Sequence, residues 1–250
     1  MLRRRRVCFV AFCLALLGGT ADSEAFQRDE ALFIRPEDQH TTLFGSLDAG
    51  RSYFLSGGSK QTLNGSLDRP GFVLVETSGV GLTRERSRDT WPSVSIDRFK
   101  HDGAVMLGYQ WMQGPVYAAA YLGPELYQEQ VAYGGRFQNF SKPLGGLRGQ
   151  VDLWANPIPE ILVTGTLIAG TAQMSVYSRA STGVRIAPNL YVGPEVTYYA
   201  TPTYNEARFG AHLTGLTVGI VQFRLSVGWM TDAAHRSGVP YGGLSAWMRL

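Results

Sequence analysis

Two glutamates stand in matching motifs and are the first candidates for chemistry in this sequence. Tyr121-Leu-Gly-Pro-Glu125 and Tyr191-Val-Gly-Pro-Glu195 lie 70 residues apart. In an extended segment, tyrosine, glycine and glutamate fall on one face, and a strand proline predicts a bulge or an edge. Paired carboxylates can cleave a glycosidic bond when one of them is a proton donor. Nearby arginines would keep both ionised, so we expect no catalysis from this pair.

The two glutamates belong to a larger set of charged residues that alternate with apolar ones. In residues 143–156, Leu147 and Val151 fall on one face, whereas Arg148 and Asp152 fall on the other. Charges enclosed by an apolar wall should pair, because a buried unpaired charge is costly. The predicted interior charge network comprises Glu125, Arg148, Asp152, Arg179, Arg185, Glu195, Arg208 and Arg224.

Two roles remain open for such an interior. The network either fills and stiffens the space or lines a narrow polar passage. In the second case, aromatic rings on the same faces would offer flat surfaces for stacking against sugars. These candidate lumen aromatics are Tyr117, Tyr121, Trp154, Tyr177, Tyr191 and Trp247. Filler or interfacial roles are more common for such residues, so the pattern favours the structural role.

Histidine is scarce, and its placement gives little support for an enzyme. No His-x-x-x-His or acidic-loop pattern predicts a metal site, and no Gly-x-Ser-x-Gly element follows residue 25. His212 is predicted to face the interior, and His235 lies in a predicted loop near Ser237. A lipid hydrolase is therefore the least favoured function. We predict no catalytic residues, no metal and no cofactor.

The N-terminus has the composition of an export signal. Arg3 to Arg6 are basic, 13 apolar residues follow from Val7 to Gly19, and small residues permit cleavage after Ala21 or Ala25. A short membrane anchor is the less favoured alternative, because the apolar run is too short to span a bilayer comfortably. The sequence predicts a signal peptide over 1–25 and a polar periplasmic lead-in over 26–40.

Removal of the predicted signal changes what the composition implies. Cys8 and Cys13 both lie within it, so the remaining chain has no cysteine for disulfides, zinc ligation or a thiol nucleophile. Four of the 23 basic and two of the 20 acidic residues also lie there, which leaves 19 basic and 18 acidic residues. A nearly neutral chain does not imply nucleic acid as a partner.

Strict two-residue alternation predicts an all-β domain over 41–250. In residues 221–229, Val, Phe, Leu, Val and Trp alternate with Gln, Arg, Ser and Gly, which gives one apolar and one polar face. Alternation and turn residues together indicate about twelve strands. We place them near 41–49, 51–64, 71–86, 101–113, 115–130, 143–156, 160–172, 174–186, 189–201, 207–218, 220–232 and 240–250.

The connections indicate where the apolar face lies. Every second connection is short, apart from 64–71, whereas the longest candidates on the other side are 87–100, 131–142 and 232–240. Such asymmetry is typical of a single antiparallel up-and-down barrel in the outer membrane of a Gram-negative cell. Aromatic residues near strand ends, such as Trp111 and Trp229, would form its interfacial girdles. A soluble barrel or sandwich is the alternative, since it produces the same alternation.

Several ordered motifs resemble the cellulose biosynthesis protein BcsS family, over roughly residues 41–250. They are Gly108-Tyr109-Gln110, Tyr121-Leu-Gly-Pro-Glu125, Leu153-Trp154 with Asn156-Pro157, Tyr177-Ser-Arg179-Ala180, Gly193-Pro194-Glu195, and Arg208-Phe-Gly210 with Gly215-Leu216; Leu43-Phe-Gly45 and Gly71-Phe72 fit as well. The sequence departs from the family's pattern in the predicted loops 87–100 and 131–142. The resemblance supplies no catalytic residues.

The resemblance implies a non-enzymatic outer-membrane barrel that is accessory to the biosynthesis and secretion of cellulose or a related exopolysaccharide. Its implied partners are outer-membrane lipid, cellulose or a related glucan, and the cellulose synthase and secretion machinery. Cellulose is neutral, so arginine and glutamate would brace a route rather than attract the polymer. A general small-solute porin and a structural envelope barrel remain as alternatives.

Overall fold

A computed structural model of the chain describes residues 39–86, 95–137, 141–232 and 235–250. The predicted signal peptide and all but the last two residues of the predicted lead-in lie outside the described residues. No helix in the described part is long and apolar enough to cross a membrane. The described residues form antiparallel strands joined by turns.

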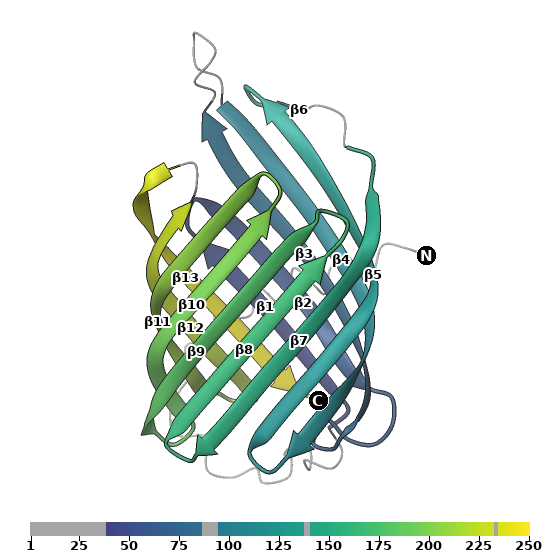
Figure 1. Cartoon of the computed structure of the whole chain (residues 1–250), viewed down its shortest axis with the longest axis vertical. Coiled ribbons are helices and arrows are strands. Elements are labelled where there is room, and N and C mark those ends of the chain that lie inside the picture. The colour runs from purple at the N-terminus through teal and green to yellow at the C-terminus, as the bar shows by residue number, and fades with distance from the viewer. Residues whose placement is uncertain (1–38, 87–94, 138–140, 233–234) are drawn as a thin grey trace. The chain divides into compact units, whose positions relative to one another are not determined.

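The strands close into a barrel (Figure 1). Neighbours along the sequence pair in order, β1 pairs with β13, and β4 pairs with β5. The two-residue strand β6 pairs only with the end of β5, so the other twelve described strands make up the wall. The strands are β1 (Thr41–Ala49), β2 (Ser52–Thr62), β3 (Gly71–Arg86), β4 (Ser95–Gln113), β5 (Val116–Tyr133), β6 (Arg136–Phe137), β7 (Leu144–Ile158), β8 (Ile161–Gly170), β9 (Ser175–Ala187), β10 (Leu190–Thr201), β11 (Tyr204–Val218), β12 (Val221–Asp232) and β13 (His235–Arg249).

The predicted closed barrel of about twelve strands is thus confirmed, but several strands extend beyond their predicted ends. β4 begins at Ser95, within the predicted loop 87–100, and β13 begins at His235, so 232–240 is not a long loop. Charged residues at the start of β4 pair with neighbouring strands. Arg84 bonds Asp97 at 2.8 Å, and Arg98 bonds Glu129 at 2.8 Å. Arg84 and Asp97 face each other directly, whereas Arg98 and Glu129 are diagonal neighbours, and both arrangements of opposite charges favour strand pairing.

Tight turns are concentrated at the end of the barrel where β1 begins and β13 ends. Three of the two-residue turns there contain a residue with positive φ, namely Gly114 (56°), Asn189 (59°) and Gly219 (60°). Such turns match the twist of paired strands and require glycine or asparagine. The eight-residue connection between β2 and β3 is the predicted exception. The opposite end also has short turns, such as 50–51 and 202–203, so the asymmetry is partial.

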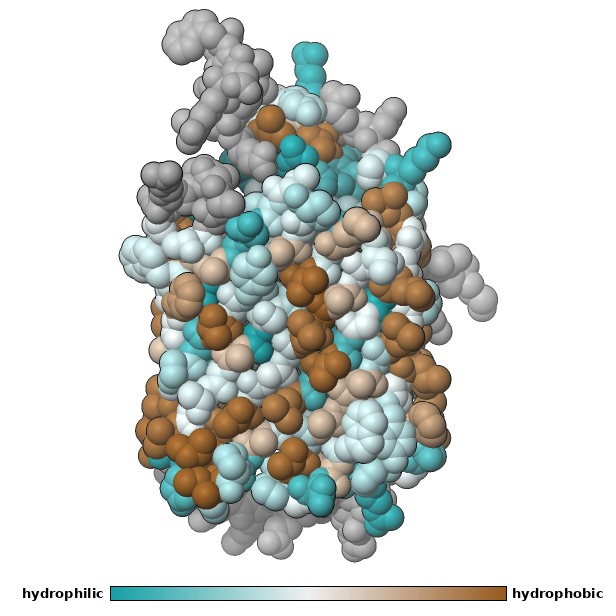
Figure 2. All heavy atoms as spheres, in the orientation of Figure 1, coloured by the Kyte–Doolittle hydropathy of each residue, from teal (hydrophilic) through white to brown (hydrophobic). Residues whose placement is uncertain are grey.

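The apolar face of the strands lies on the outside of the barrel. On β12, Leu225, Val227 and Trp229 are exposed, whereas Arg224 is only 3% exposed. On β7, Leu147 and Val151 are exposed as well. Figure 2 shows apolar side chains spread over one such outer face. A soluble barrel would bury these residues, so the alternation has the polarity of an outer-membrane type barrel.

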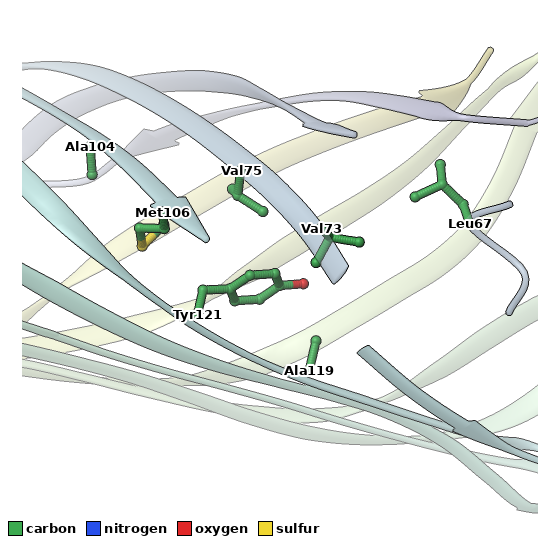
Figure 3. Close-up of a cluster of buried hydrophobic side chains, with 7 residues drawn as sticks. All are labelled: Leu67, Val73, Val75, Ala104, Met106, Ala119 and Tyr121. Carbon is green, nitrogen blue, oxygen red and sulfur yellow. The ribbon is translucent and has the colours of Figure 1, made fainter. Parts of the chain in front are cut away.

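One part of the interior is apolar, which the sequence did not predict. Side chains from β3, β4 and β5 meet inside the barrel, and Leu67 joins them from the β2–β3 connection (Figure 3). Gln110 holds this connection in place, because its side-chain amide donates to the carbonyl oxygens of Leu67 (2.9 Å) and Arg69 (2.6 Å). The cluster comprises Leu67, Val73, Val75, Ala104, Met106, Ala119 and Tyr121.

Candidate functional site in the barrel interior

The repeated Tyr-x-Gly-Pro-Glu motif has the same geometry on β5 and on β10. A Cβ atom on Gly123 would lie 2.0 Å from the carbonyl oxygen of Val105, and one on Gly193 would lie 2.0 Å from that of Thr182. The ladder toward β4 or β9 is interrupted beside each glycine, without the predicted bulge at either proline. Proline lacks the N–H that this side of the ladder would need. Both motif glutamates face the interior and are buried.

Each carboxylate oxygen of Glu125 accepts a hydrogen bond. The guanidinium of Arg148 donates from Nε to Glu125 Oε2 at 3.0 Å, and the backbone N–H of Ala172 donates to Oε1 at 2.7 Å. Arg148 also bonds Asp102 Oδ2 at 2.7 Å and contacts Thr77 Oγ1 at 3.4 Å. The arginine therefore connects β7 with β5, β4 and β3, and Glu125 acts as an anion in a brace.

Glu195 pairs with Arg224 in the most deeply buried ion pair of the described residues. Each side chain is only 3% exposed. The Nη1 atom of Arg224 also donates to Thr164 Oγ1 at 3.2 Å, and Thr164 bonds Ser181 at 2.7 Å. These contacts start on β12 and reach β8, across three intervening strands. They cross the interior instead of following the wall.

Arg208 on β11 forms a third group, which joins β11 to β1. Its guanidinium lies 2.6 Å from Glu206 Oε1 and 3.1 Å from Asp48 Oδ1 on β1. Tyr204 donates a hydrogen bond of 2.6 Å to the second oxygen of Glu206. Sequence reasoning missed Asp48, Asp102 and Glu206. The same alternation would have found them on β1, β4 and β11.

The remaining predicted network residues, Arg185, Asp152 and Arg179, lie outside these three groups. Arg185 was predicted to face the interior, but it lies at the rim of the barrel, where it pairs with the exposed Glu160 of the β7–β8 turn at 2.9 Å. Asp152 accepts a hydrogen bond from Gln150 at 2.8 Å. Arg179 is half-buried and, among the described residues, forms no ion pair within bonding distance. Glu195, Asp48 and Asp152 are the acids in its electrostatic surroundings.

The predicted lumen aromatics are dispersed. Tyr121 is 5% exposed and lies in the apolar cluster, where its hydroxyl bonds that of Tyr117 at 2.8 Å. Lys60 donates to Tyr117 at 2.8 Å. Trp154 and Trp247 meet edge to face at 6.1 Å between ring centroids. These four aromatic side chains form two separate pairs and therefore not a continuous surface for sugar stacking.

Tyr191 and Tyr177 lie apart from those four rings. The Tyr191 hydroxyl lies between Asn156 and the Pro159 carbonyl at the turn end of the barrel. Tyr177 is half-buried on β9, two residues from Arg179. Sugar stacking by any of the six rings stays a prediction.

His212 faces the interior as predicted, with 2% exposure. Its Nδ1 atom lies 2.8 Å from Thr214 Oγ1, and its Nε2 atom lies 3.1 Å from the carbonyl oxygen of Thr182. Ser226 stands opposite on β12, but both ring nitrogens are already engaged. The described residues contain no group of three or more His, Cys, Asp or Glu side chains placed to hold a metal ion. The side chain of His235 lies outside the described residues.

Comparisons with known proteins give a family and a similar fold. The family model "Cellulose biosynthesis protein BcsS" matches residues 42–250. A search among curated protein sequences finds no match. The transport unit of the autotransporter AIDA-I from Escherichia coli is similar in structure, with 11% identity, a TM-score of 0.50, and coverage of 91% of this chain and 94% of that one.

Two further solved structures are similar at lower scores. The KdgM porin has 9% identity and a TM-score of 0.46, covering 84% of this chain and 99% of its own. The β domain of the Bordetella autotransporter Brka has 12% identity and a TM-score of 0.46, covering 84% and 98%. At such identities the similarity concerns the fold alone.

Proposed function

Because the chain belongs to the BcsS family of cellulose biosynthesis proteins, we propose that it is an outer-membrane barrel that assists the synthesis and secretion of cellulose without catalysing a reaction. The apolar outer face is the observation that carries the location. On β3 this face extends from Phe72 to Leu82, ten residues apart. For a tilted strand that spacing corresponds to about 25 Å of height, the usual thickness of the apolar band.

Aromatic side chains near both ends of this band support the same location. Phe72, Tyr109 and Trp111 cluster toward the end with the tight turns, with centroid distances of 5.2 and 5.0 Å. Tyr198 and Trp229 are exposed toward the other end. Such belts are typical of both membrane interfaces. Tyr199, by contrast, alternates to the interior, so it is not part of a girdle.

The bridged interior supports an accessory role over that of an open conduit. A glucan chain would have to displace the Arg148 and Arg224 contacts, and a neutral polymer would not compensate the charges left behind. We infer that the barrel serves the cellulose synthesis and secretion machinery through its surfaces, as a fixed element of the envelope. No catalytic constellation is needed for that role.

A small-solute passage is the second candidate, and one observation favours it. Arg179 faces the interior without an ion pair among the described residues, as a pore-lining arginine would. Single-channel recording in planar bilayers separates the two candidates. The accessory role predicts little or no conductance, whereas the porin predicts stable ion-conducting steps.

Deletion of the protein in its own host tests the proposed function directly. We expect loss of secreted cellulose while cellulose synthase activity in isolated membranes persists. Unchanged secreted cellulose would contradict the proposal. Fractionation and heat-modifiable gel mobility in detergent test the location separately, because a folded outer-membrane barrel migrates faster before boiling than after it.

A further inference from the structure

One glutamate lies in the middle of the outer apolar face. Glu76 on β3 is exposed on the same face as Phe72 and Val80, four residues from each. At the rise of a strand, that is roughly 13 Å along the chain in either direction. Within the described residues, Glu76 has no hydrogen bond or ion pair.

Charges elsewhere on the outer face are placed differently. Arg84 and Asp97 also face outward, but they lie near strand ends and pair with each other at 2.8 Å. If the outer face contacts lipid, as the proposed function requires, an isolated carboxylate at the middle of the band is costly. An ionisable residue in such a place is a candidate for a functional contact, and a contact that stabilises a carboxylate has to supply a hydrogen-bond donor.

The neighbourhood of Glu76 contains donors as well as this acceptor. Ser59 on β2 stands directly opposite Glu76, and Gln61 lies two residues further along the same face of β2. Ser78 follows Glu76 on the same face of β3. The Gln61 side chain reaches toward Ser59, at 3.4 Å. Hydroxyl and amide donors and a carboxylate acceptor therefore share one patch, which we call the Glu76 patch.

The surface beside the Glu76 patch is flat enough for close approach. The next row of outward positions crosses four strands as Gly45, Gly57, Ser78 and Gly103. Small side chains let the backbones of two membrane segments come near each other, which shortens polar contacts between them. Larger apolar residues border the row, among them Leu55 and Val105.

We propose that the Glu76 patch is the two-fold interface between two copies of this barrel. In a two-fold interface the same surface of both copies meets. If one residue of the first copy contacts a second residue of the other copy, the reverse contact also forms. A patch that carries both donors and an acceptor is therefore its own complement. The carboxylate of Glu76 accepts from Gln61, Ser59 or Ser78 of the second copy and leaves the lipid. This inference rests on the proposed membrane location.

Single-cysteine crosslinking tests the interface, because Cys8 and Cys13 are the only cysteines of the sequence. The full chain carries Cys8→Ser and Cys13→Ser, with Ser78→Cys added. The matched control is Ser178→Cys. Position 178 also faces outward, but it lies on β9, on the opposite side of the barrel from β3. A membrane-permeable bis-maleimide is applied to native membranes. We expect a product of twice the monomer mass for Ser78→Cys, severalfold more abundant than for Ser178→Cys.

Changes at Glu76 in the Ser78→Cys background test the hydrogen bonds. Glu76→Val removes the acceptor and should reduce the crosslinked dimer severalfold, whereas Glu76→Gln keeps an acceptor and should retain most of it. Equal crosslinking at both cysteine positions, no dimer in either, a heavier product of another mass, or no effect of Glu76→Val would each overturn the proposal.

The location is checked in the same samples. If the unmodified chain is absent from the outer-membrane fraction, the proposed function fails. If it is present and heat-modifiable but Ser78→Cys yields no dimer, only the interface is wrong.

Discussion

Arg224 and Glu195 form an ion pair between β12 and β10 in which both side chains are almost fully enclosed. Removal of one partner of a buried pair leaves an uncompensated charge and typically costs about 3–5 kcal/mol. We therefore expect Arg224→Ala to lower the free energy of unfolding by that order. Arg224→Met combined with Glu195→Leu should cost less than Arg224→Met alone. Urea unfolding in detergent, followed by gel mobility, measures the difference.

The control for this prediction is Arg185→Ala. Arg185 and Glu160 form an exposed pair at the rim, and such pairs contribute about 0–1 kcal/mol. If Arg224→Ala costs no more than Arg185→Ala, the interior pair is not a brace.

Arg148 is expected to limit the free cross-section of the interior. Its guanidinium joins Asp102 and Glu125 from β7. Arg148→Ala should therefore raise single-channel conductance in planar bilayers above that of the unmodified protein. Arg185→Ala, at the rim, should leave conductance unchanged. Equal conductance of all three proteins would show that another part of the interior sets the constriction.

Leu67 is expected to anchor the β2–β3 connection inside the barrel mouth. It is 3% exposed in the apolar cluster, so Leu67→Ala should lower the free energy of unfolding by about 2–5 kcal/mol. Leu63, in the same connection but 56% exposed, provides the control, and Leu63→Ala should have little effect. Equal effects of the two changes would mean that Leu67 does not pack as described.

A side chain at position 193 is expected to destabilise the barrel. A Cβ there would lie 2.0 Å from the carbonyl oxygen of Thr182, so Gly193→Ala must push β9 and β10 apart. Overpacking of this kind costs about 1–3 kcal/mol. Gly165→Ala is the control, since its Cβ would lie 3.7 Å from the nearest atom, in Leu153. Thermal unfolding in detergent compares them, and similar melting temperatures would refute the explanation.

His212 is expected to be structural. Because both ring nitrogens already have partners, His212→Gln should not change fatty-acid release from phospholipid vesicles, which we expect to be at background level with either protein. Release by the unmodified chain that disappears in His212→Gln would revive the lipid-hydrolase alternative.

Period-two alternation was sufficient to locate the twelve strands approximately and to place many of the inward charges, because the outward face of most strands is predominantly apolar. It failed where alternation is absent. Residues 72–75 are Phe, Val, Leu and Val, so both faces of β3 are apolar there, and the sequence could not indicate the interior cluster around Val73 and Val75. The prediction that Arg185 faces the interior was wrong for another reason. Arg185 lies near the end of β9, and its long side chain reaches the rim.

The pairing of β1 with β13 joins the two ends of the described sheet, about 200 residues apart in sequence. Closing a loop of that length costs about 5 kcal/mol of chain entropy, and the seam can form only after every intervening strand has arrived. Until then β1 and β13 are open edges, the kind of surface on which chains aggregate. A chain whose seam has not yet closed is therefore expected to aggregate, and mutations that delay closure should appear as insoluble, protease-sensitive chain.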